Sequence, residues 1–132
     1  MAASRVFSPA PATDARQRGA AAEELAARFL AAQGLTIALR NYRRRLGELD
    51  LVALEHGVLV IAEVRLRSSE RYGGAAASID GRKRRRIVRA TQQLLQQRKD
   101  FARLPVRFDV IAVSDLESVA PRIEWIRHAF EA

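Results

Sequence analysis

The sequence predicts a layered α/β domain in which helices cover both faces of a central sheet. Two segments repeat their apolar residues with the helical period, and several runs rich in Val, Leu and Ile have the length of strands. In the two central runs the apolar residues occupy both alternating faces, which is typical of a sheet that is covered on both sides. These observations favour an α/β/α arrangement over an exposed β-meander.

Length and composition limit the class of protein. The chain has 132 residues, of which 48% are hydrophobic, so we expect one globular domain over residues 14–132 and a disordered Ala-, Pro- and Ser-rich tail over residues 1–13. No apolar run reaches the ~18 residues of a membrane span, and no secretory signal is present. The sequence therefore predicts a soluble cytoplasmic protein with no membrane partner.

The charged and metal-binding residues indicate a polyanionic partner. The formal net charge of +8 favours nucleic acid, with DNA as the first expectation. The chain has no cysteine and two histidines, so thiolate sites are excluded and a histidine zinc site is not expected. Any metal would be held by oxygen ligands, which favours Mg²⁺ or Mn²⁺.

Residues 14–33 have the apolar spacing of a helix that Gly34 ends. Glu24 points away from the apolar stripe and has Arg28 four residues on, which predicts a solvated ion pair. Glu23 lies at the flank of the stripe, where its side chain can lean over the edge of the sheet. Glu23 is therefore the helix residue most suited to a site, although flanking glutamates are more often only surface residues.

Residues 35–39 predict a short strand, and residues 41–45 predict a basic connector. The connector contains Arg43 and Arg45 and leads directly into the most acidic part of the predicted sheet. A solvated turn is the simpler interpretation of these arginines. Next to a metal site they would instead bind phosphates.

Residues 47–67 predict a β-hairpin around His56 and Gly57. A two-residue loop places Glu55 opposite Val58, Asp50 opposite Glu63, and Glu48 opposite Arg65. The last four of these residues, Asp50, Glu63, Glu48 and Arg65, then share a face with the apolar residues near the turn, Val52, Leu54, Leu59 and Ile61. Leu49, Leu51 and Ala53 lie on the other face.

Opposed carboxylates destabilise a sheet unless positive charge lies between them. Asp50 and Glu63 at a sheet end form an arrangement that holds a divalent cation, and Arg65 lies two residues after Glu63 on the same face. The alternative is a charged strand end that Arg65 and Arg67 balance. On this pattern alone the alternative is the better interpretation.

Residues 67–77 predict a mobile loop that leaves the charged end of the hairpin. The segment contains Tyr72 followed by two glycines, and Arg67 begins it. Loops in this position often close over a ligand, so Arg67 and Tyr72 are candidate nucleic-acid contacts. A plain connector fits the composition equally well.

A second helix is predicted from about Asp80, as its N-cap, to about Lys99. Its first turns contain Arg82, Lys83, Arg85 and Arg86, although the helix dipole disfavours cations there by about 0.3–1 kcal/mol per charge at low salt. We favour nucleic-acid contact over an idle solvated face for this cluster.

Two further strands complete the predicted sheet. Residues 106–113 form an apolar run with the single acid Asp109, for which a structural ion pair with Arg107 is favoured over a supporting role in a site. Residues 122–126 predict a last short strand with Trp125 packed on the sheet. The chain contains no Gly-rich phosphate loop and no Ser/His/Asp constellation.

Motifs in a fixed order resemble the uncharacterised, YraN-like protein family numbered 0102. That family carries a G-x-x-A-E-x-x-A helix, an N-Y-R-x-R-x-G-E-I-D-L-I strand, an F-V-E-V-K strand, an R-F/Y-G loop, a K-x-R-R helix start, an R-F-D-V strand and a terminal I-x-x-A-F. The matching residues here include Gly19, Glu23, Asn41, Tyr42, Gly47, Asp50, Glu63, Tyr72, Lys83, Arg107, Asp109, Ile126 and Phe130.

The family in turn resembles the PD-(D/E)xK nucleases with the restriction-endonuclease-like fold, including archaeal Holliday junction resolvases. The resemblance implies a mixed-sheet α/β/α core and cleavage of DNA or structured nucleic acid. It implies that Asp50 and Glu63 bind the metal, that Glu23 completes the site and that position 65 carries the catalytic lysine. A homodimer follows only by analogy with the resolvases.

Position 65 departs from the family, because the lysine of E-V-K is Arg65 here. Arginine binds phosphate but is a poor substitute where a lysine contacts the nucleophilic water. Lys83 is a second source of an ammonium group. The alternatives to a nuclease are a catalytically impaired nucleic-acid-binding module of the same fold and a protein–protein adaptor with structural carboxylates.

Overall fold

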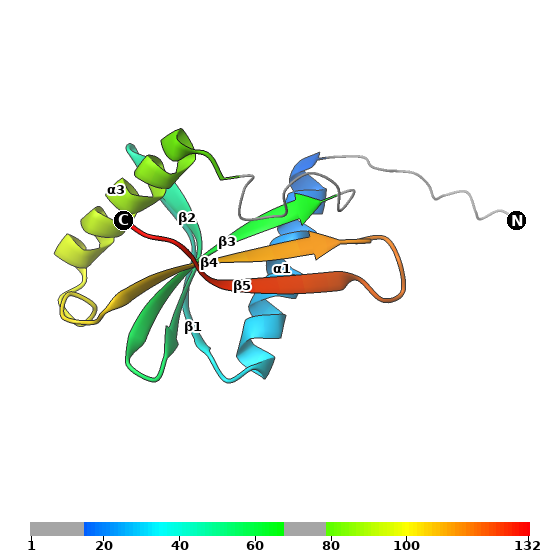
Figure 1. Ribbon diagram of the computed structural model, residues 1–132, viewed down its shortest axis with the longest axis horizontal. Coiled ribbons are helices and arrows are strands. Elements are labelled where there is room, and N and C mark those ends of the chain that lie inside the picture. The colour runs from blue at the N-terminus through cyan, green and yellow to red at the C-terminus, as the bar shows by residue number, and fades with distance from the viewer. Residues whose placement is uncertain (1–14, 68–78) are drawn as a thin grey trace, which may run out of the picture.

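The computed structural model describes residues 15–67 and 79–132, which form an α/β fold (Figure 1). One five-stranded sheet has the strand order β1-β2-β3-β4-β5. Its core is consistent with that of restriction endonucleases. The elements are α1 (Ala15–Ala32), β1 (Thr36–Arg44), β2 (Gly47–Glu55), β3 (Val58–Arg67), α3 (Gly81–Gln97), β4 (Val106–Ser114) and β5 (Arg122–Phe130).

The sheet is mixed because one of its neighbouring strand pairs is parallel. β3 and β4 pair in parallel, and every other neighbouring pair is antiparallel. A parallel pair requires a crossover connection, which here contains α3. The same connection brings the basic start of α3 to the sheet edge at which β2 begins.

Each face of the sheet has its own core, and Figure 1 shows α1 and α3 on different sides of the sheet. The small residues Ala22, Ala26 and Ala27 of α1 pack with Leu51 and Val60 on one face. On the other face, α3 packs through a larger stripe with the residues of the hairpin. That stripe consists of Ile87, Ala90 and Leu94. The predicted α/β/α layering is confirmed.

The predicted hairpin turn is confirmed. His56 and Gly57 have φ angles of 48° and 80°, the left-handed conformation that a type I′ turn requires at both central residues. Glu55 pairs with Val58, and regular pairing continues up to Leu51 with Ala62. The hydrophobic residues near the turn therefore lie on the predicted face.

Two strands are longer than predicted. The predicted basic connector is wrong, because residues 41–44 continue β1 and only residues 45–46 form the turn into β2. A bulge between Ile37 and Leu39, and a positive φ of 52° at Asn41, let this polar segment follow the sheet as an edge strand. The last strand likewise continues beyond residue 126, to Phe130.

The helix boundaries follow the prediction closely. α1 spans Ala15–Ala32, and α3 begins after the N-cap Asp80, whose side chain accepts a 2.9 Å hydrogen bond from the Lys83 N–H. No helix within the described residues is long and apolar enough to cross a membrane. The predicted tail over residues 1–13 and most of the predicted loop, residues 68–77, lie outside the described residues.

Candidate carboxylate site and basic helix

Asp50 and Glu63 meet where the β2–β3 ladder ends. Pairing stops at Leu51 and Ala62, one pair before the two acids. The Asp50 N–H donates to Glu63 Oε2 at 3.3 Å, and the Val64 N–H donates to Asp50 Oδ2 at 2.9 Å. Each carboxylate therefore accepts from the backbone of the opposite strand, and together these bonds replace the next step of the ladder.

Glu63 is buried without full hydrogen bonding. It is 1% exposed, and its Oε1 is a buried oxygen that has no hydrogen-bond partner among residues 15–67 and 79–132. Burial raises the pKa of Glu63 well above its ordinary value of 4.5, and the nearby charge of Asp50 raises it further. Burial is also the largest cause that raises the pKa of Asp50. Two acids of this kind are stable either with a shared proton or with a cation.

At Asp50 the side chains of β2 stop alternating regularly between the two faces of the sheet. Leu49 belongs to the core under α3, whereas Leu51 belongs to the core under α1, so the prediction that they share a face is wrong. On the neighbouring strand Asn41, with its positive φ, lies at this point. Asp50 can therefore interact electrostatically with residues of both helical layers.

The positive charge of Lys83 acts on the carboxylates of both Asp50 and Glu63. Its charge lowers the pKa of Asp50 and of Glu63, against the effect of burial. Lys83 also lines a small pocket of about 40 Å³ with Glu48, Arg86 and Ile87. The sequence suggested Lys83 mainly as a nucleic-acid contact, and the structure adds this position beside the acids.

The start of β2 packs closely on α3 at Gly47. A Cβ atom at this glycine would lie 2.4 Å from the Arg86 carbonyl oxygen, so only glycine permits the approach. This contact fixes the first two turns of α3 against the acidic end of the hairpin. It is the physical reason for a glycine directly before Glu48.

The predicted pairing of Glu48 with Arg65 is wrong. The ladder between β2 and β3 has ended before these residues, and Glu48 pairs with Arg43 of β1. Their side chains form a 3.3 Å salt bridge that is 72% and 49% exposed, so it contributes little stability. Arg65 is half-buried and pairs in register with Ala112 of β4.

Glu23 of α1 approaches the site from the other layer. Its pKa is raised, first by burial and then by the charge of Asp50, while a hydrogen bond with Asn41 and the charge of Arg43 lower it. The predicted solvated ion pair of Glu24 with Arg28 is confirmed. Glu24 bonds to Arg28 at 2.7 Å and to Arg40 at 2.6 Å in an exposed cluster.

The carboxylates suit a weakly held, hydrated cation. Across residues 15–67 and 79–132, no three acidic or histidine side chains form a group that could hold a metal ion. Mg²⁺ commonly binds through one or two carboxylates and keeps several waters. The partnerless Oε1 of Glu63 and the repulsion between Glu63 and Asp50 fit that mode of binding.

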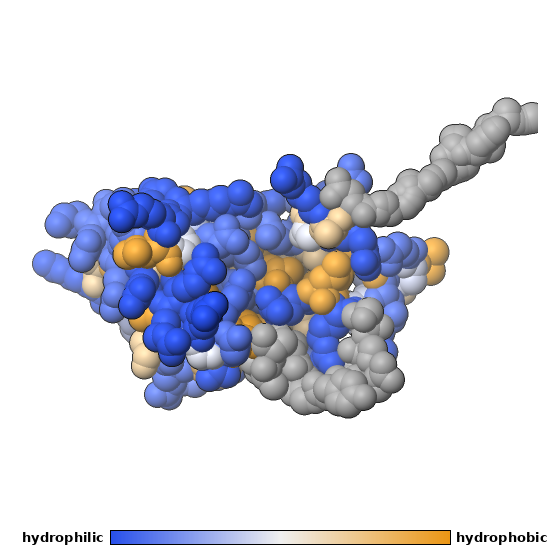
Figure 2. Space-filling view, turned by 90° about the horizontal axis from the view of Figure 1, so that it is seen from above, coloured by the Kyte–Doolittle hydropathy of each residue, from blue (hydrophilic) through white to orange (hydrophobic). Residues whose placement is uncertain are grey.

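The basic residues occupy two flanks of α3 and the adjacent turn. Arg86 and Lys83 line the small pocket beside Glu48, whereas Arg84, Arg85 and Arg89 line a larger pocket on another flank. Figure 2 shows the molecule from above the view of Figure 1, and hydrophilic side chains cover most of the surface that is seen there. Arg82, Arg85 and Arg86 are exposed, as are Arg43 and Arg45 of the β1–β2 hairpin.

Asp80 changes how the helix start can bind an anion. Its carboxylate already accepts from the Lys83 N–H, and its carbonyl accepts from the Arg84 N–H. Phosphate contact at this end would therefore rely on side chains rather than on free backbone donors. Arg67 ends β3 and is half-buried. Tyr72, the other predicted contact in that segment, lies outside the described residues.

Asp109 has a structural role, as the favoured interpretation predicted. It is fully buried and accepts four hydrogen bonds, two from Arg107 and one each from the Trp125 Nε1–H and the His128 N–H. Arg107 and Arg127 both also bond to Glu55. His128 has a φ of 52° and lies in a bulge of β5, so Asp109 fixes that irregular segment.

Taken together, the fold and the site define an α/β protein with a buried and a half-buried carboxylate in contact within a mixed sheet, where the β2–β3 ladder ends, beside the basic start of a helix. Comparison with known sequences identifies the group. A family model described as "Uncharacterised protein family UPF0102" matches residues 22–113, and the chain belongs to this family.

Curated relatives match along most of their own length. A UPF0102 protein of Pseudomonas aeruginosa (strain LESB58) is 44% identical over 118 residues, which cover 89% of this chain and 94% of the relative. One from Methylococcus capsulatus is 47% identical over 114 residues, covering 86% and 90%. One from Halorhodospira halophila is 46% identical over 117 residues, covering 89% of each chain.

Proposed function

We propose that this protein is a metal-dependent, nuclease-like protein that hydrolyses phosphodiester bonds in DNA or structured nucleic acid. The observation that carries the proposal is the contact between the buried Glu63 and the half-buried Asp50. Within residues 15–67 and 79–132 one Glu63 oxygen has no hydrogen-bond partner, and the charge of Lys83 acts on both acids. When both acids are ionised, a buried carboxylate oxygen without a partner costs stability, and a bound cation would remove that cost.

Asp50 and Glu63 would hold Mg²⁺ or Mn²⁺. When bound, such an ion supplies positive charge at the scissile phosphate and lowers the pKa of a coordinated water. Glu23 would orient water or a metal-bound group from the α1 side. The arginines of the β1–β2 turn and of α3 would hold the flanking phosphates.

Lys83 would take over the role that a lysine at position 65 has in related sequences. It is the cation whose charge opposes the raised pKa of both acids, and its long flexible stem suits contact with a water or a developing charge. Arg65 would contact phosphate. The position of Lys83 at the carboxylates thus offers a way in which the substitution of arginine at position 65 is tolerated.

Cleavage assays with Mg²⁺ or Mn²⁺ on branched, linear and single-stranded DNA test the proposal. We expect Asp50→Asn and Glu63→Gln to abolish cleavage, and Glu24→Gln, an exposed acid of the same helix as Glu23, to leave it unchanged. If neither ion supports cleavage by the unmodified protein on any of these substrates, the catalytic proposal is wrong.

A second set of variants tests the lysine. Lys83→Ala should lower the cleavage rate by about 10²–10³-fold, the usual effect of removing one preorganised electrostatic contact. Arg65→Ala should weaken substrate binding, and Arg65→Lys should retain activity. A full loss of cleavage in Arg65→Ala together with normal cleavage in Lys83→Ala would show that position 65 keeps the catalytic role.

The alternative function is nucleic-acid binding without catalysis. The observations that favour it are the arginine at position 65 and the exposed side chains of Arg82, Arg85 and Arg86 at the start of α3. Binding that falls steeply with salt, in the absence of cleavage, would support this alternative.

A further inference from the structure

We propose that a second site, on the flank of α3 that faces β5, binds one unpaired nucleotide of a nucleic acid. We call this site the α3–β5 trough and define it by Val88, Gln92, Leu95, Phe108, Phe130 and Arg89. It consists of two adjoining pockets of about 340 and 400 Å³ that share Val88, Gln92, Glu131 and Ala132. The inference deepens the proposed function by naming its substrate class, and the role of the trough in substrate choice rests on that function.

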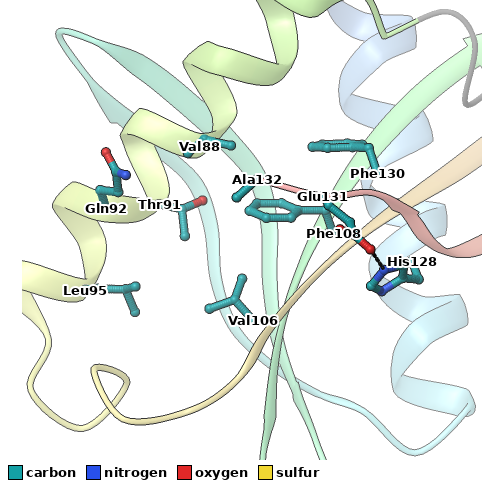
Figure 3. Close-up of a pocket in the computed structure, with 10 residues that line it drawn as sticks. All are labelled: Val88, Thr91, Gln92, Leu95, Val106, Phe108, His128, Phe130, Glu131 and Ala132. Carbon is teal, nitrogen blue, oxygen red and sulfur yellow. Dashed lines mark hydrogen bonds and ion pairs between the residues drawn. The ribbon is translucent and has the colours of Figure 1, made fainter.

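The inner part of the trough is apolar. Val88, Thr91 and Leu95 point from α3 toward Phe108 and Val106 of β4, as Figure 3 shows. The rings of Phe108 and Phe130 stack with centroids 5.0 Å apart and form part of the wall. A pocket of about 340 Å³ is in the range that holds small organic ligands, and a nucleobase offers two apolar faces to such a wall.

Hydrogen-bonding groups lie at the rim rather than in the floor. Gln92 is exposed at the edge of both pockets, and its amide can donate and accept at once, as a base edge requires. Thr91 bonds to the Ile87 carbonyl at 2.8 Å and is therefore already satisfied. The trough thus presents an adaptable amide beside an apolar surface, which suits the edge and faces of a base.

Cations line the second pocket of the trough, and one of them, Arg84, lies over the Phe130 ring at 5.2 Å from its centroid. Arg84, Arg85 and Arg89 line the outer pocket, and Arg85 and Arg89 lie one helical turn apart on the same flank. Like charges at this spacing destabilise a helix, and a bound phosphate would relieve their repulsion. From Leu95 through Gln92 to Arg89 and Arg85, apolar wall, amide and arginines extend along about three turns of helix, which suits a base, a sugar and a phosphate in that order.

One acid opposes this arrangement and provides a test. Glu131 lines both pockets, where it pairs with His128 at 3.1 Å through side chains that are 81% and 59% exposed. An exposed pair of this kind is weak and is easily displaced. Because its carboxylate lies near the proposed phosphate position, removing its charge should strengthen binding.

A nucleotide enters such a trough only when it is not stacked within a duplex. Extrusion from an intact duplex costs several kcal/mol, and the cost is lowest for a base that is already unpaired. Lys83 and Arg86, at the carboxylates, lie on the same two turns of α3 as the arginines of the trough. A strand that crosses the helix start would place a junction or single-stranded end beside the acids.

Binding assays by fluorescence anisotropy in EDTA test the inference without relying on catalysis. The probes are a labelled single strand, an abasic strand with the same number of phosphates, and a blunt duplex. We expect the full protein to bind the normal single strand about tenfold more tightly than the abasic strand. The blunt duplex should bind no better than the abasic strand at the same salt concentration.

Variants assign the preference to the trough. Val88→Trp, which fills it, and Gln92→Ala should each remove most of the preference for the normal strand, whereas Gln96→Ala on the same helix should not. Arg82→Gln should weaken the normal and abasic strands equally. Glu131→Gln should tighten the normal strand by two- to fivefold, and circular dichroism identifies any variant that fails to fold.

The outcomes separate this inference from the proposed function. Equal affinity for normal and abasic strands, or an unchanged preference in both Val88→Trp and Gln92→Ala, would overturn the trough proposal even if the protein cleaves DNA. Binding of an acidic aromatic peptide at this site in place of the normal strand would also overturn it. A base preference without any cleavage would retain the trough and reject the nuclease.

Discussion

Replacing Glu63 by glutamine tests whether the buried acids repel each other. Glutamine keeps the shape of the side chain, can still accept from the Asp50 N–H, and can donate from its amide to the Asp50 carboxylate. It removes one negative charge from a position that is 1% exposed. We therefore expect Glu63→Gln to stabilise the protein near neutral pH in the absence of divalent metal.

The sign of the pH dependence follows from the raised pKa of Glu63. The native state binds the Glu63 proton more tightly than the unfolded chain does, so ionisation destabilises the native state. The free energy of unfolding of the unmodified protein, compared with that of Glu63→Gln, is therefore highest below the ordinary pKa of 4.5. It falls as the pH rises through the raised pKa of Glu63. A buried polar group that lacks a hydrogen-bond partner costs about 1–3 kcal/mol, so a gain of that size is expected at pH 8.

Urea unfolding at pH 4 and pH 8 measures this difference. Glu63→Gln should exceed the unmodified protein in free energy of unfolding at pH 8 and match it at pH 4. Glu24→Gln is the matched control, because the Glu24 carboxylate pairs with Arg28 and Arg40 at the surface. Millimolar Mn²⁺ should stabilise the unmodified protein at pH 8 and have little effect on Glu63→Gln, since only a folded, ionised pair binds it.

Two results would refute the reasoning. The first is a difference in free energy of unfolding, variant minus unmodified protein, that is smaller at pH 8 than at pH 4. This result would show that Lys83 fully compensates the charge of Glu63. An equal stabilisation by Mn²⁺ in both proteins would show that the ion binds elsewhere.

The remaining predictions concern residues that position the site. Asp109→Ala should cost about 3–5 kcal/mol in the free energy of unfolding measured with urea, because the Trp125 Nε1–H and the His128 N–H lose their acceptor and Arg107 keeps Glu55 but loses two hydrogen bonds. A cost below about 1 kcal/mol would contradict this role. Gly47→Ala should cost about 1–3 kcal/mol through its clash with the Arg86 carbonyl, and Gly19→Ala, whose Cβ meets no atom within 4 Å, is its control. Tyr42→Phe should cost about 1 kcal/mol through loss of the 2.6 Å bond to Gln97, and an unchanged melting temperature would show that solvent replaces this bond.

The layers and the hairpin could be predicted because their signals are local. Helix periodicity and the N-cap at Asp80 determine the boundaries of both helices. The adjacent His56 and Gly57 determine the register of β2 and β3, since a two-residue turn leaves one choice of pairing. Extending that register to Asp50 and Glu63 correctly brought the two acids together.

The end of the hairpin could not be predicted in the same way. Strict alternation placed Leu49 with Leu51 and Glu48 opposite Arg65, but β2 changes face near Asp50. That change involves Asn41 on the neighbouring strand, and its positive φ has no clear signal in a basic, polar stretch. The full length of β1 was equally hidden, because an exposed edge strand lacks the apolar alternation that identifies a strand.

The position of Lys83 illustrates a second limit. Its place at the acids depends on a crossover connection and on the close packing of Gly47 against α3. Both are tertiary features that join segments far apart in sequence. Residue type alone suggested phosphate contact for every cation of the helix start, and only the packing of α3 separates Lys83 and Arg86 from Arg85 and Arg89.

The irregular outer strands affect how the molecule meets its own copies. β1 and β5 are the edges of the sheet, and each contains a bulge and a residue with positive φ, at Asn41 and His128. A regular edge offers an unbroken row of backbone donors and acceptors that a second chain can extend, whereas a bulged, charged edge does not. Aggregation through strand addition is thereby opposed at both ends of the sheet.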